Sequence, residues 1–366
     1  MNKIFILLII ELFLNGCSKS QYSTTPYTKN TNTVSKAKNY NNLGAIAFNK
    51  NNKREAHSLF KKGCLLNNGH ACSNLGALYI KKGQYKRALP LLEKACTLNN
   101  GDGCARLGAL YHEGLSISKN KIKSLQLSKK SCSLNSGLGC NNLGIQYATK
   151  AHKNHVKTFQ SFKKSCYLDY GDGCNNLAKI YLSGQFGYKK NSKKAFKLTK
   201  RACGLDSAEG CSNLGAMYEH AFYPSLNPKQ AFKYYQKSCT LDISKGGCSS
   251  LGNIYLNGFS IAKDEKKAFD LFQKSCNVND SLGCMNLAIM YINGQGIKKD
   301  TKKAITLFTK SCNLENEKGC FYLGHLYEND SSIKDNIERS IFFYQKSCSL
   351  GYENACWEAQ KNVLLK

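Results

Sequence analysis

The chain has 366 residues, of which 42% are hydrophobic and four are proline, a composition that excludes a disordered polymer and is typical of a folded helical protein. It carries 53 lysines and arginines against 24 aspartates and glutamates, which gives a formal net charge of +29. This balance predicts anionic partners, such as acidic polymers, anionic lipid surfaces or nucleic acid, although lysines at exposed helix ends equally fit a solvated face. No RNA- or DNA-reading motif is present, so no specific nucleic acid is expected as a partner.

The first segment, residues 1–16, predicts an export signal, because Lys3 precedes an apolar run that ends at Leu14. The run leads into Leu14-Asn15-Gly16-Cys17, which resembles a bacterial lipobox and would make Cys17 the lipid-modified first residue of the mature protein. Cleavage without lipidation is the alternative, and Glu11 inside the apolar run departs from the usual pattern. We therefore expect an exported protein, either periplasmic, anchored to the outer membrane or secreted.

The next segment, residues 17–35, is polar and lacks periodicity, which predicts a flexible tether with a root-mean-square span of about 20–25 Å. A helical array is expected from residue 36 to residue 354. Residues 355–366 are expected to form a C-terminal capping helix, with Trp357 and Val363–Leu365 closing the end of the core.

The array is marked by cysteines in pairs. Eight pairs are separated by eight residues and one pair by nine, namely Cys64 with Cys72, Cys96 with Cys104, Cys132 with Cys140, Cys166 with Cys174, Cys203 with Cys211, Cys239 with Cys248, Cys276 with Cys284, Cys312 with Cys320 and Cys348 with Cys356. Residues eight apart in one helix lie about 12 Å apart, whereas a disulfide requires Cα atoms within about 4.4–6.8 Å. If each pair is bonded, the chain must reverse between its two cysteines.

Zinc is the alternative partner for these thiols. Two thiolates per unit would need two further ligands, and the chain has no C-x2-C pairs and no regularly placed histidines. We therefore expect disulfides, an oxidising compartment, no metal and no cofactor. Gly and Asn between the paired cysteines predict helix ends and turns, and Asp102 or Asp172 is expected to cap the start of the following helix.

Two helical patterns alternate along the array, and we name them helix A and helix B. Helix A begins at the second cysteine and reads N-L-G/A-x-x-Y, as in Asn74–Tyr79. Its recurring glycine or alanine predicts a close approach between helices, because glycine costs about 1 kcal/mol relative to alanine inside a helix. Helix B ends at the next cysteine and reads K-K-A-F/I-x-L-F-x-K-S-C, as in Lys266–Cys276 and Lys302–Cys312. Nine copies of the helix A pattern predict nine repeats.

These motifs together resemble the Sel1-like repeat, specifically its cysteine-rich subgroup typified by the Helicobacter cysteine-rich protein family, over about residues 36–357. The resemblance implies an all-α, right-handed superhelix of αα-hairpins with one disulfide per repeat. It also implies an exported β-lactamase-family protein that binds or slowly hydrolyses penicillin-like compounds or binds peptidoglycan-derived fragments. Other members of the wider repeat class act as adaptors, which implies an extended peptide or a protein as the alternative partner.

The residues themselves do not supply a catalytic motif for that activity. A serine β-lactamase needs a Ser-x-x-Lys pair and a K-T-G element. No K-T-G occurs, and Ser-x-x-Lys pairs, such as Ser58/Lys61, Ser161/Lys164, Ser260/Lys263 and Ser331/Lys334, are expected by chance in a chain this rich in serine and lysine. His152 and His155 form the nearest histidine pair and do not complete a metal site. The catalytic residues are therefore unknown.

A binding function depends instead on the helix A residues that follow each second cysteine by two positions. These residues are predicted to lie off the core face, in the concave groove of the superhelix, where an amide can pair with a peptide backbone or a sugar amide. They are Asn74, Arg106, Asn142, Asn176, Asn213 and Asn286, with Ser250 and Tyr322 in two other repeats. The alternative is that asparagine there only helps the helix to start. A structural role at the cell envelope or toward a host is a third hypothesis.

Overall fold

The structure is a computed structural model that describes residues 33–149, 154–220, 223, 225–258, 261–329 and 335–364. The predicted export signal, Cys17 and most of the predicted tether lie outside these residues. No described helix is both long enough and apolar enough to cross a membrane.

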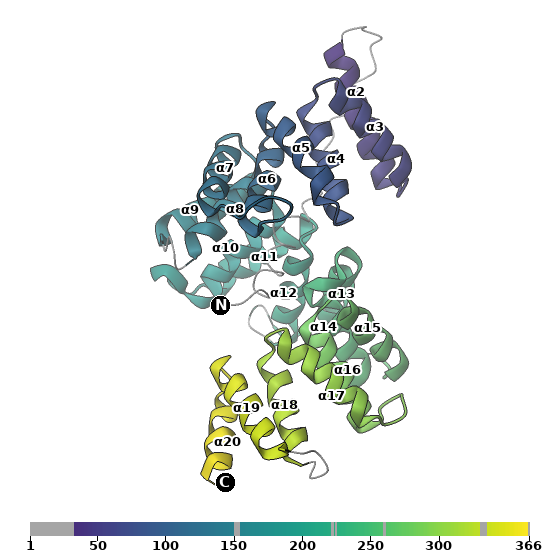
Figure 1. The fold of residues 1–366 in the computed structure, drawn as a ribbon, viewed down its shortest axis with the longest axis vertical. Helices are drawn as coiled ribbons and strands as arrows, with labels where there is room; N and C mark the ends of the chain where they lie inside the picture. The colour runs from purple at the N-terminus through teal and green to yellow at the C-terminus, as the bar shows by residue number, and fades with distance from the viewer. Residues whose placement is uncertain are drawn as a thin grey trace. The chain divides into compact units, whose positions relative to one another are not determined.

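The described residues form nineteen α-helices and two short 3-10 helices, which confirms the all-α prediction (Figure 1). The helices are α2 (Thr33–Asn49), α3 (Lys53–Leu65), α4 (Gly69–Lys81), α5 (Tyr85–Thr97), α6 (Gly101–Glu113), α7 (Lys121–Ser133), α8 (Gly137–Ala148), α9 (His155–Tyr167), α10 (Gly171–Ser183), η1 (Gln185–Gly187), α11 (Ser192–Gly204), α12 (Ala208–Glu219), α13 (Pro228–Leu241), η2 (Ile243–Lys245), α14 (Gly247–Asn257), α15 (Glu265–Asn277), α16 (Ser281–Asn293), α17 (Thr301–Asn313), α18 (Glu317–Glu328), α19 (Asn336–Ser349) and α20 (Glu353–Leu364).

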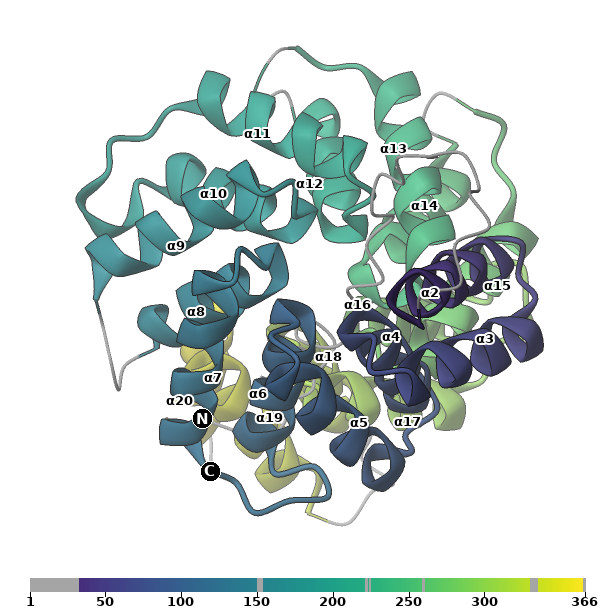
Figure 2. The same cartoon turned by 90° about the horizontal axis from the view of Figure 1, so that it is seen from above.

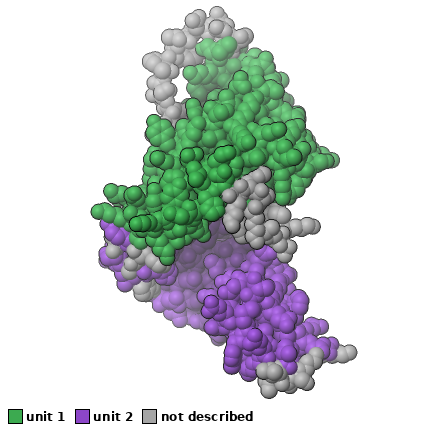
Figure 3. Space-filling model, turned by 90° about the vertical axis from the view of Figure 1, so that its left-hand side faces the viewer, with its two compact units in different colours: residues 1–205 green, residues 206–366 purple. Residues whose placement is uncertain are grey.

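The chain divides into two compact units, residues 1–205 and residues 206–366 (Figure 3). In each unit the even-numbered helices are A helices and the odd-numbered helices are B helices. Within each unit, the A helices pack against the B helices before and after them in the chain, and most also contact the next A helix (Figures 1 and 2). The A helices therefore form one continuous layer in each unit and the B helices form the other. This is the predicted αα-hairpin solenoid.

The chain reverses between paired cysteines through a short turn, which between α5 and α6 is only three residues long. The middle residue of the turn adopts the left-handed conformation, as in Asn99 with φ 55° or Asn135 with φ 57°. The following residue is an extended N-cap, and the Asn100 side chain accepts a hydrogen bond from the Gly103 N–H at 2.7 Å. Asparagine tolerates the left-handed region because its short side chain can hydrogen-bond locally.

The expected capping role of Asp102 and Asp172 is wrong. Because the turn is so short, both aspartates already lie in the first helical turn, of α6 and α10 respectively. Their negative charge is favourable there, near the positive end of the helix dipole. The residue at the N-cap position of α10 is Tyr170, whose side chain makes no capping hydrogen bond.

The cysteines of the array form disulfides between sequence neighbours, as the pairing predicted. Eight of the bonds have Cα–Cα distances between 4.4 and 4.8 Å, within the range that a disulfide requires. They join Cys64 to Cys72, Cys96 to Cys104, Cys132 to Cys140, Cys166 to Cys174, Cys239 to Cys248, Cys276 to Cys284, Cys312 to Cys320 and Cys348 to Cys356. Cys203 and Cys211 are also disulfide-bonded.

Each disulfide links the end of a B helix to the first turns of the next A helix. The second cysteine of each of eight pairs is at most 1% exposed, namely Cys72, Cys104, Cys140, Cys174, Cys211, Cys248, Cys284 and Cys320. Cys356, on the terminal helix α20, is only half-buried, because no described helix packs beyond it. The bonds therefore lie inside the repeat array rather than on its surface. This abundance of disulfides is typical of an oxidising, extracellular compartment.

The glycines of the A helices allow the predicted close approach to the B helices. A Cβ atom at Gly76 would lie 2.7 Å from Leu92, and one at Gly252 would lie 2.6 Å from the Phe272 ring. Both of these partners are fully buried. Any larger residue at the glycine would push the two helices apart, so small size is the requirement.

The two ends of the array differ from the expected boundaries. Helix α2 begins at Thr33, three residues before the expected start, and its Val34 side chain is 72% exposed. Helix α20 begins at Glu353, and Ala355 and Ala359 pack against Tyr344. Trp357, which was expected to close the core, is 62% exposed. Trp357 directly follows the second cysteine of its repeat, and in earlier repeats the residue at this position contacts the next A helix. Because no described helix follows α20, the Trp357 side chain has no such helix to pack against.

Candidate binding face of the A helices

The side chain two positions after the second cysteine bridges neighbouring A helices. Asn74 Nδ2 donates a hydrogen bond to Asn41 Oδ1 at 3.0 Å, and Asn176 Nδ2 donates to Asn141 Oδ1 at 2.8 Å. In both cases the acceptor lies on the preceding A helix, directly after the second cysteine or, for Asn41, after the residue that stands in its place. Asn74 and Asn176 are half-buried. These amides therefore hold the A-helix layer together, and part of each remains accessible.

The equivalent side chains of α6 and α8 are buried in the same contact. Arg106 is 2% exposed, and its Nη1 lies 3.2 Å from Ser73 Oγ and 3.8 Å from Asp102 Oδ2. Asn142 is fully buried, and its Nδ2 lies 3.5 Å from the Ala105 carbonyl oxygen. These two side chains, predicted to line a groove, are oriented into helix packing instead. A binding role for them stays a prediction.

In unit 2 the same position is buried in one repeat and exposed in another. Asn286 is 8% exposed and donates through Nδ2 to Asn253 Oδ1 at 3.0 Å. Asn213 is half-buried and makes contacts of its own, and Tyr322 is 38% exposed. His325, three residues after Tyr322 on α18, is also exposed. The candidate binding residues of unit 2 are therefore Asn213, Asn253, Asn286, Tyr322 and His325.

Sequence reasoning missed Asn253 and His325. Both lie five positions after the second cysteine of their repeat, three residues beyond the position that was singled out. Residues three apart share one face of a helix, so helical periodicity was the signal that could have found them. Other repeats carry alanine, isoleucine or lysine at this position, which hid the pattern.

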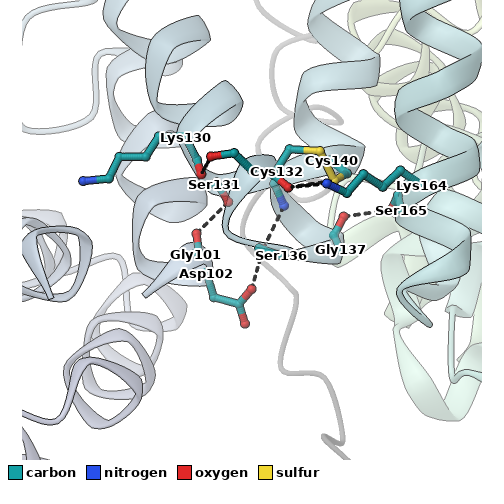
Figure 4. The surroundings of a disulfide bond; sticks show 12 residues. Gly101, Asp102, Lys130, Ser131, Cys132, Ser136, Gly137, Cys140, Lys164 and Ser165 are labelled. Carbon is teal, nitrogen blue, oxygen red and sulfur yellow. Dashed lines mark hydrogen bonds between the residues drawn. A yellow bond between two sulfur atoms is a disulfide. The ribbon is translucent and has the colours of Figure 1, made fainter. Parts of the chain in front are cut away.

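Six of the B helices end in Lys-Ser-Cys, and this sequence makes contacts with the neighbouring helices (Figure 4). Ser131 Oγ donates to the Gly101 carbonyl oxygen at 2.6 Å, and Ser165 Oγ donates to that of Gly137 at 2.7 Å. Each serine thus donates to a carbonyl in the first turn of the A helix of its own hairpin. The hydroxyl of Ser131 is buried in this contact, which leaves it a structural role.

Of the four Ser-x-x-Lys pairs named above, the two that lie in the described part of the chain do not form a nucleophile and base pair. Lys164 Nζ donates to the Cys132 carbonyl oxygen at 2.9 Å, and Ser161 is 7% exposed. Ser58 and Lys61 are both exposed on α3. The remaining two pairs include residues outside the described ranges, as does the pair of His152 with His155. Among the residues that the structure describes, no group of three or more His, Cys, Asp or Glu could hold a metal ion.

Two tyrosines of unit 2 have strongly perturbed hydroxyls. Burial, and then a hydrogen bond to Glu219 at 2.5 Å, raises the pKa of Tyr235 well above its usual value. Burial, and then a hydrogen bond to Glu328 at 2.6 Å, raises the pKa of Tyr344 in the same way. Each ring lies over the glycine of the A helix in its own hairpin. The shared geometry indicates a packing role rather than catalysis.

The repeat geometry is matched by a known family. The model of the Sel1 repeat matches residues 101–136, 171–207, 208–243, 247–280, 281–316 and 318–352, which is more than half of the chain. The chain belongs to the Sel1 repeat family. A tetratricopeptide repeat model also matches residues 69–102. No curated protein matches the chain at a significant level.

Two solved structures show the same repeat fold, and a third solved protein is similar in sequence over part of the chain. A Sel1 repeat protein from Oxalobacter formigenes has a TM-score of 0.53 at 22% identity, over 66% of this chain and 96% of that one. The c5321 protective antigen of uropathogenic Escherichia coli has a TM-score of 0.52 at 21% identity, over 92% of this chain and 75% of that one. Helicobacter pylori cysteine rich protein B is 34% identical over 36% of this chain and 93% of that one, with a TM-score of 0.30.

Proposed function

We propose that this Sel1 repeat protein is an exported, non-catalytic binding module for an extended peptide, a protein segment or a peptidoglycan-derived fragment. Repeat folds of this kind generally mediate protein–protein interaction by presenting one continuous layer of helices. The observation that carries the proposal is the hydrogen bond from Asn286 to Asn253, which holds two amides of adjacent A helices in fixed positions. The next A helix in the layer, α18, packs against α16 and carries the exposed Tyr322 and His325. A positioned amide keeps donor and acceptor capacity for a backbone or a sugar amide.

The test uses the oxidised protein and two ligand pools, a displayed library of extended peptides and a set of purified muropeptides. A ligand recovered from either pool is titrated by fluorescence anisotropy. Changing both Asn213 and Asn286 to alanine should weaken binding by about tenfold, because each lost hydrogen bond contributes about 0.5–1.5 kcal/mol. Changing Asn277 and Gln236, which are exposed on B helices, to alanine is the matched control. Equal weakening by both pairs would contradict the proposal.

The resemblance to the Helicobacter cysteine-rich proteins supports a second candidate function, the binding or slow hydrolysis of β-lactams. What favours it is the pattern of one disulfide per repeat at a spacing of eight residues. Turnover of a chromogenic cephalosporin by the pure, oxidised protein would establish this activity. Turnover that survives replacement of both Ser58 and Ser161 by alanine would exclude these two serines as its nucleophile.

Export and lipidation form a separate part of the proposal. The apolar start of the chain and the Leu14-Asn15-Gly16-Cys17 sequence support cleavage before Cys17 and acylation of its thiol. Mass spectrometry of the N-terminal peptide from envelope fractions tests both steps. An unmodified N-terminus beyond Cys17 would replace anchoring with plain secretion.

A further inference from the structure

The positive charge of the chain is confined to one unit. Residues 1–205 contain 34 lysines and arginines against 7 aspartates and glutamates, a formal net charge of +27. Residues 206–366 contain 19 against 17, a formal net charge of +2. A bias that acted on the whole chain would charge both units alike, since both are built from the same repeat. The asymmetry therefore marks unit 1 as the unit that meets an anionic partner.

Within unit 1 the charge is concentrated on three successive B helices. Helices α7, α9 and α11 carry 12 lysines and arginines and no aspartate or glutamate. Part of this charge is used inside the fold, since Lys123 lies 4.3 Å from the centre of the Tyr111 ring and Lys164 bonds to Cys132. Lys130, Lys157 and Lys194 likewise contact neighbouring helices. Six further exposed lysines of these helices form what we call the basic outer face, namely Lys121, Lys129, Lys163, Lys193, Lys197 and Lys200.

Exposed aliphatic side chains accompany these lysines. Ile122, the second residue of α7, is 74% exposed, and Val156, the second residue of α9, is 59% exposed. The equivalent residues of the unit 2 helices α13, α15 and α17 are all lysine. Unit 1 has therefore replaced a charged residue with an apolar one at the start of two adjacent B helices.

We propose that the basic outer face and the adjoining Ile122 and Val156 dock unit 1 on the surface of an anionic phospholipid bilayer. Lysines are attracted to the negative surface potential of such a bilayer, and neighbouring aliphatic side chains enter the boundary between headgroups and acyl chains. A nucleic acid or an acidic polymer would use the lysines but has no apolar layer for the aliphatic side chains.

The position of unit 1 in the chain agrees with this partner. The predicted tether leads directly into α2, the first helix of unit 1. An acylated Cys17 would therefore hold the basic unit, rather than the nearly neutral one, within about 20–25 Å of a bilayer. The docking face is on B helices, which leaves the A-helix face available for the ligand proposed above. The two proposals do not depend on one another.

The experiment measures co-sedimentation of the oxidised chain from Ser18 onward, which keeps every described residue and lacks Cys17. The vesicles are phosphatidylcholine alone or phosphatidylcholine with phosphatidylglycerol. We expect binding to the anionic vesicles only, weakened strongly when salt rises from about 0.1 M to about 0.5 M because exposed charges are then screened. Neutralising the six lysines of the basic outer face to glutamine should reduce the partition coefficient by at least about tenfold.

A matched variant neutralises six exposed lysines of unit 2, namely Lys229, Lys233, Lys266, Lys274, Lys298 and Lys302. It should lower the partition coefficient by less than about threefold, because its contribution is only that of net charge. Equal losses in the two variants would overturn the assignment to unit 1. Circular dichroism of both variants confirms that they are folded.

The last two measurements distinguish an anionic bilayer from a soluble polyanion as the partner of the basic outer face. Changing Ile122 and Val156 to asparagine should weaken vesicle binding severalfold without changing binding to a DNA duplex or to polyglutamate. Unchanged vesicle binding by this variant would overturn the bilayer proposal. Tighter binding of the unaltered chain to DNA or polyglutamate than to anionic vesicles would also overturn it and would assign the basic outer face to a polyanion.

Discussion

The ammonium group of Lys164 donates a hydrogen bond to the carbonyl oxygen of Cys132 at 2.9 Å, and so joins the end of one B helix to the end of the preceding one. The same bond recurs from Lys310 to Cys276 at 2.6 Å. It places a positive charge at the negative end of a helix dipole and adds a charged donor to a carbonyl that also accepts the N–H of the following turn, from Asn135 and Asn279 respectively. Three consecutive residues of the Lys-Ser-Cys motif therefore each make a different contact with a neighbouring helix.

The first prediction concerns this lysine. Changing Lys164 to methionine keeps most of the aliphatic stem and removes the donor, and it should lower the free energy of unfolding by about 0.5–1.5 kcal/mol. The adjacent Lys163 is exposed and is the matched control, for which the same change should have an effect within about 0.5 kcal/mol. Urea denaturation followed by circular dichroism measures both. Identical midpoints would show that the bond contributes nothing to stability.

The second prediction concerns the glycine before the second cysteine. A Cβ atom at Gly139 would collide with the Ser131 side chain and lie 2.9 Å from its backbone carbonyl carbon. Gly139→Ala should therefore destabilise the protein by about 1–3 kcal/mol, as overpacking of a tight contact does. Gly204→Ala is the control, because nothing lies within 4 Å of its Cβ and alanine favours a helix. Thermal unfolding should give a lower midpoint for the first variant and an unchanged or higher midpoint for the second.

The third prediction concerns the disulfides. A bridge that closes about nine residues stabilises a protein by about 2.6 kcal/mol in the chain-entropy model. Replacing Cys276 and Cys284 together with alanine should cost roughly this amount, and reduction of all the bridges should cause a large loss of helicity. Far-ultraviolet circular dichroism with and without reductant tests the latter. A reduced protein with full helicity would show that packing alone holds the hairpins.

The fourth prediction concerns alkaline pH. The raised pKa of Tyr235 and Tyr344 keeps both phenols neutral in the folded protein, whereas an unfolded tyrosine loses its proton near pH 10. The stabilisation is therefore fully present below about pH 10 and falls as the pH rises above it, because only the unfolded chain ionises. Tyr235→Phe together with Tyr344→Phe should make this alkaline loss less steep. The test measures the urea midpoint of the unaltered protein and of the double variant at several pH values below and above about pH 10. If the two midpoints fall in parallel as the pH rises, Tyr235 and Tyr344 do not cause the alkaline loss of stability.

The hairpins and their disulfides could be predicted because the features that determine them are local. A spacing of eight residues permits a bond only if the chain turns, and asparagine and glycine between the cysteines provide that turn. The close approach at the glycines of the A helices could be predicted for the same reason. Glycine is unfavourable in a helix, so its recurrence at a fixed position indicates that a larger side chain does not fit there. The capping residue was misjudged because the turn is only three residues long, and the length of a turn is not written in its composition.

The orientation of the A-helix amides was decided only by tertiary structure. Asn176 meets Asn141, 35 positions earlier in the chain, because α10 packs against α8. Arg106 is buried and Tyr322 is exposed, although both occupy the same repeat position. Local periodicity specifies which face a residue shares, but the neighbouring helix determines whether that face is covered. The division into a strongly basic unit and a nearly neutral one likewise required the contacts that separate residues 1–205 from residues 206–366.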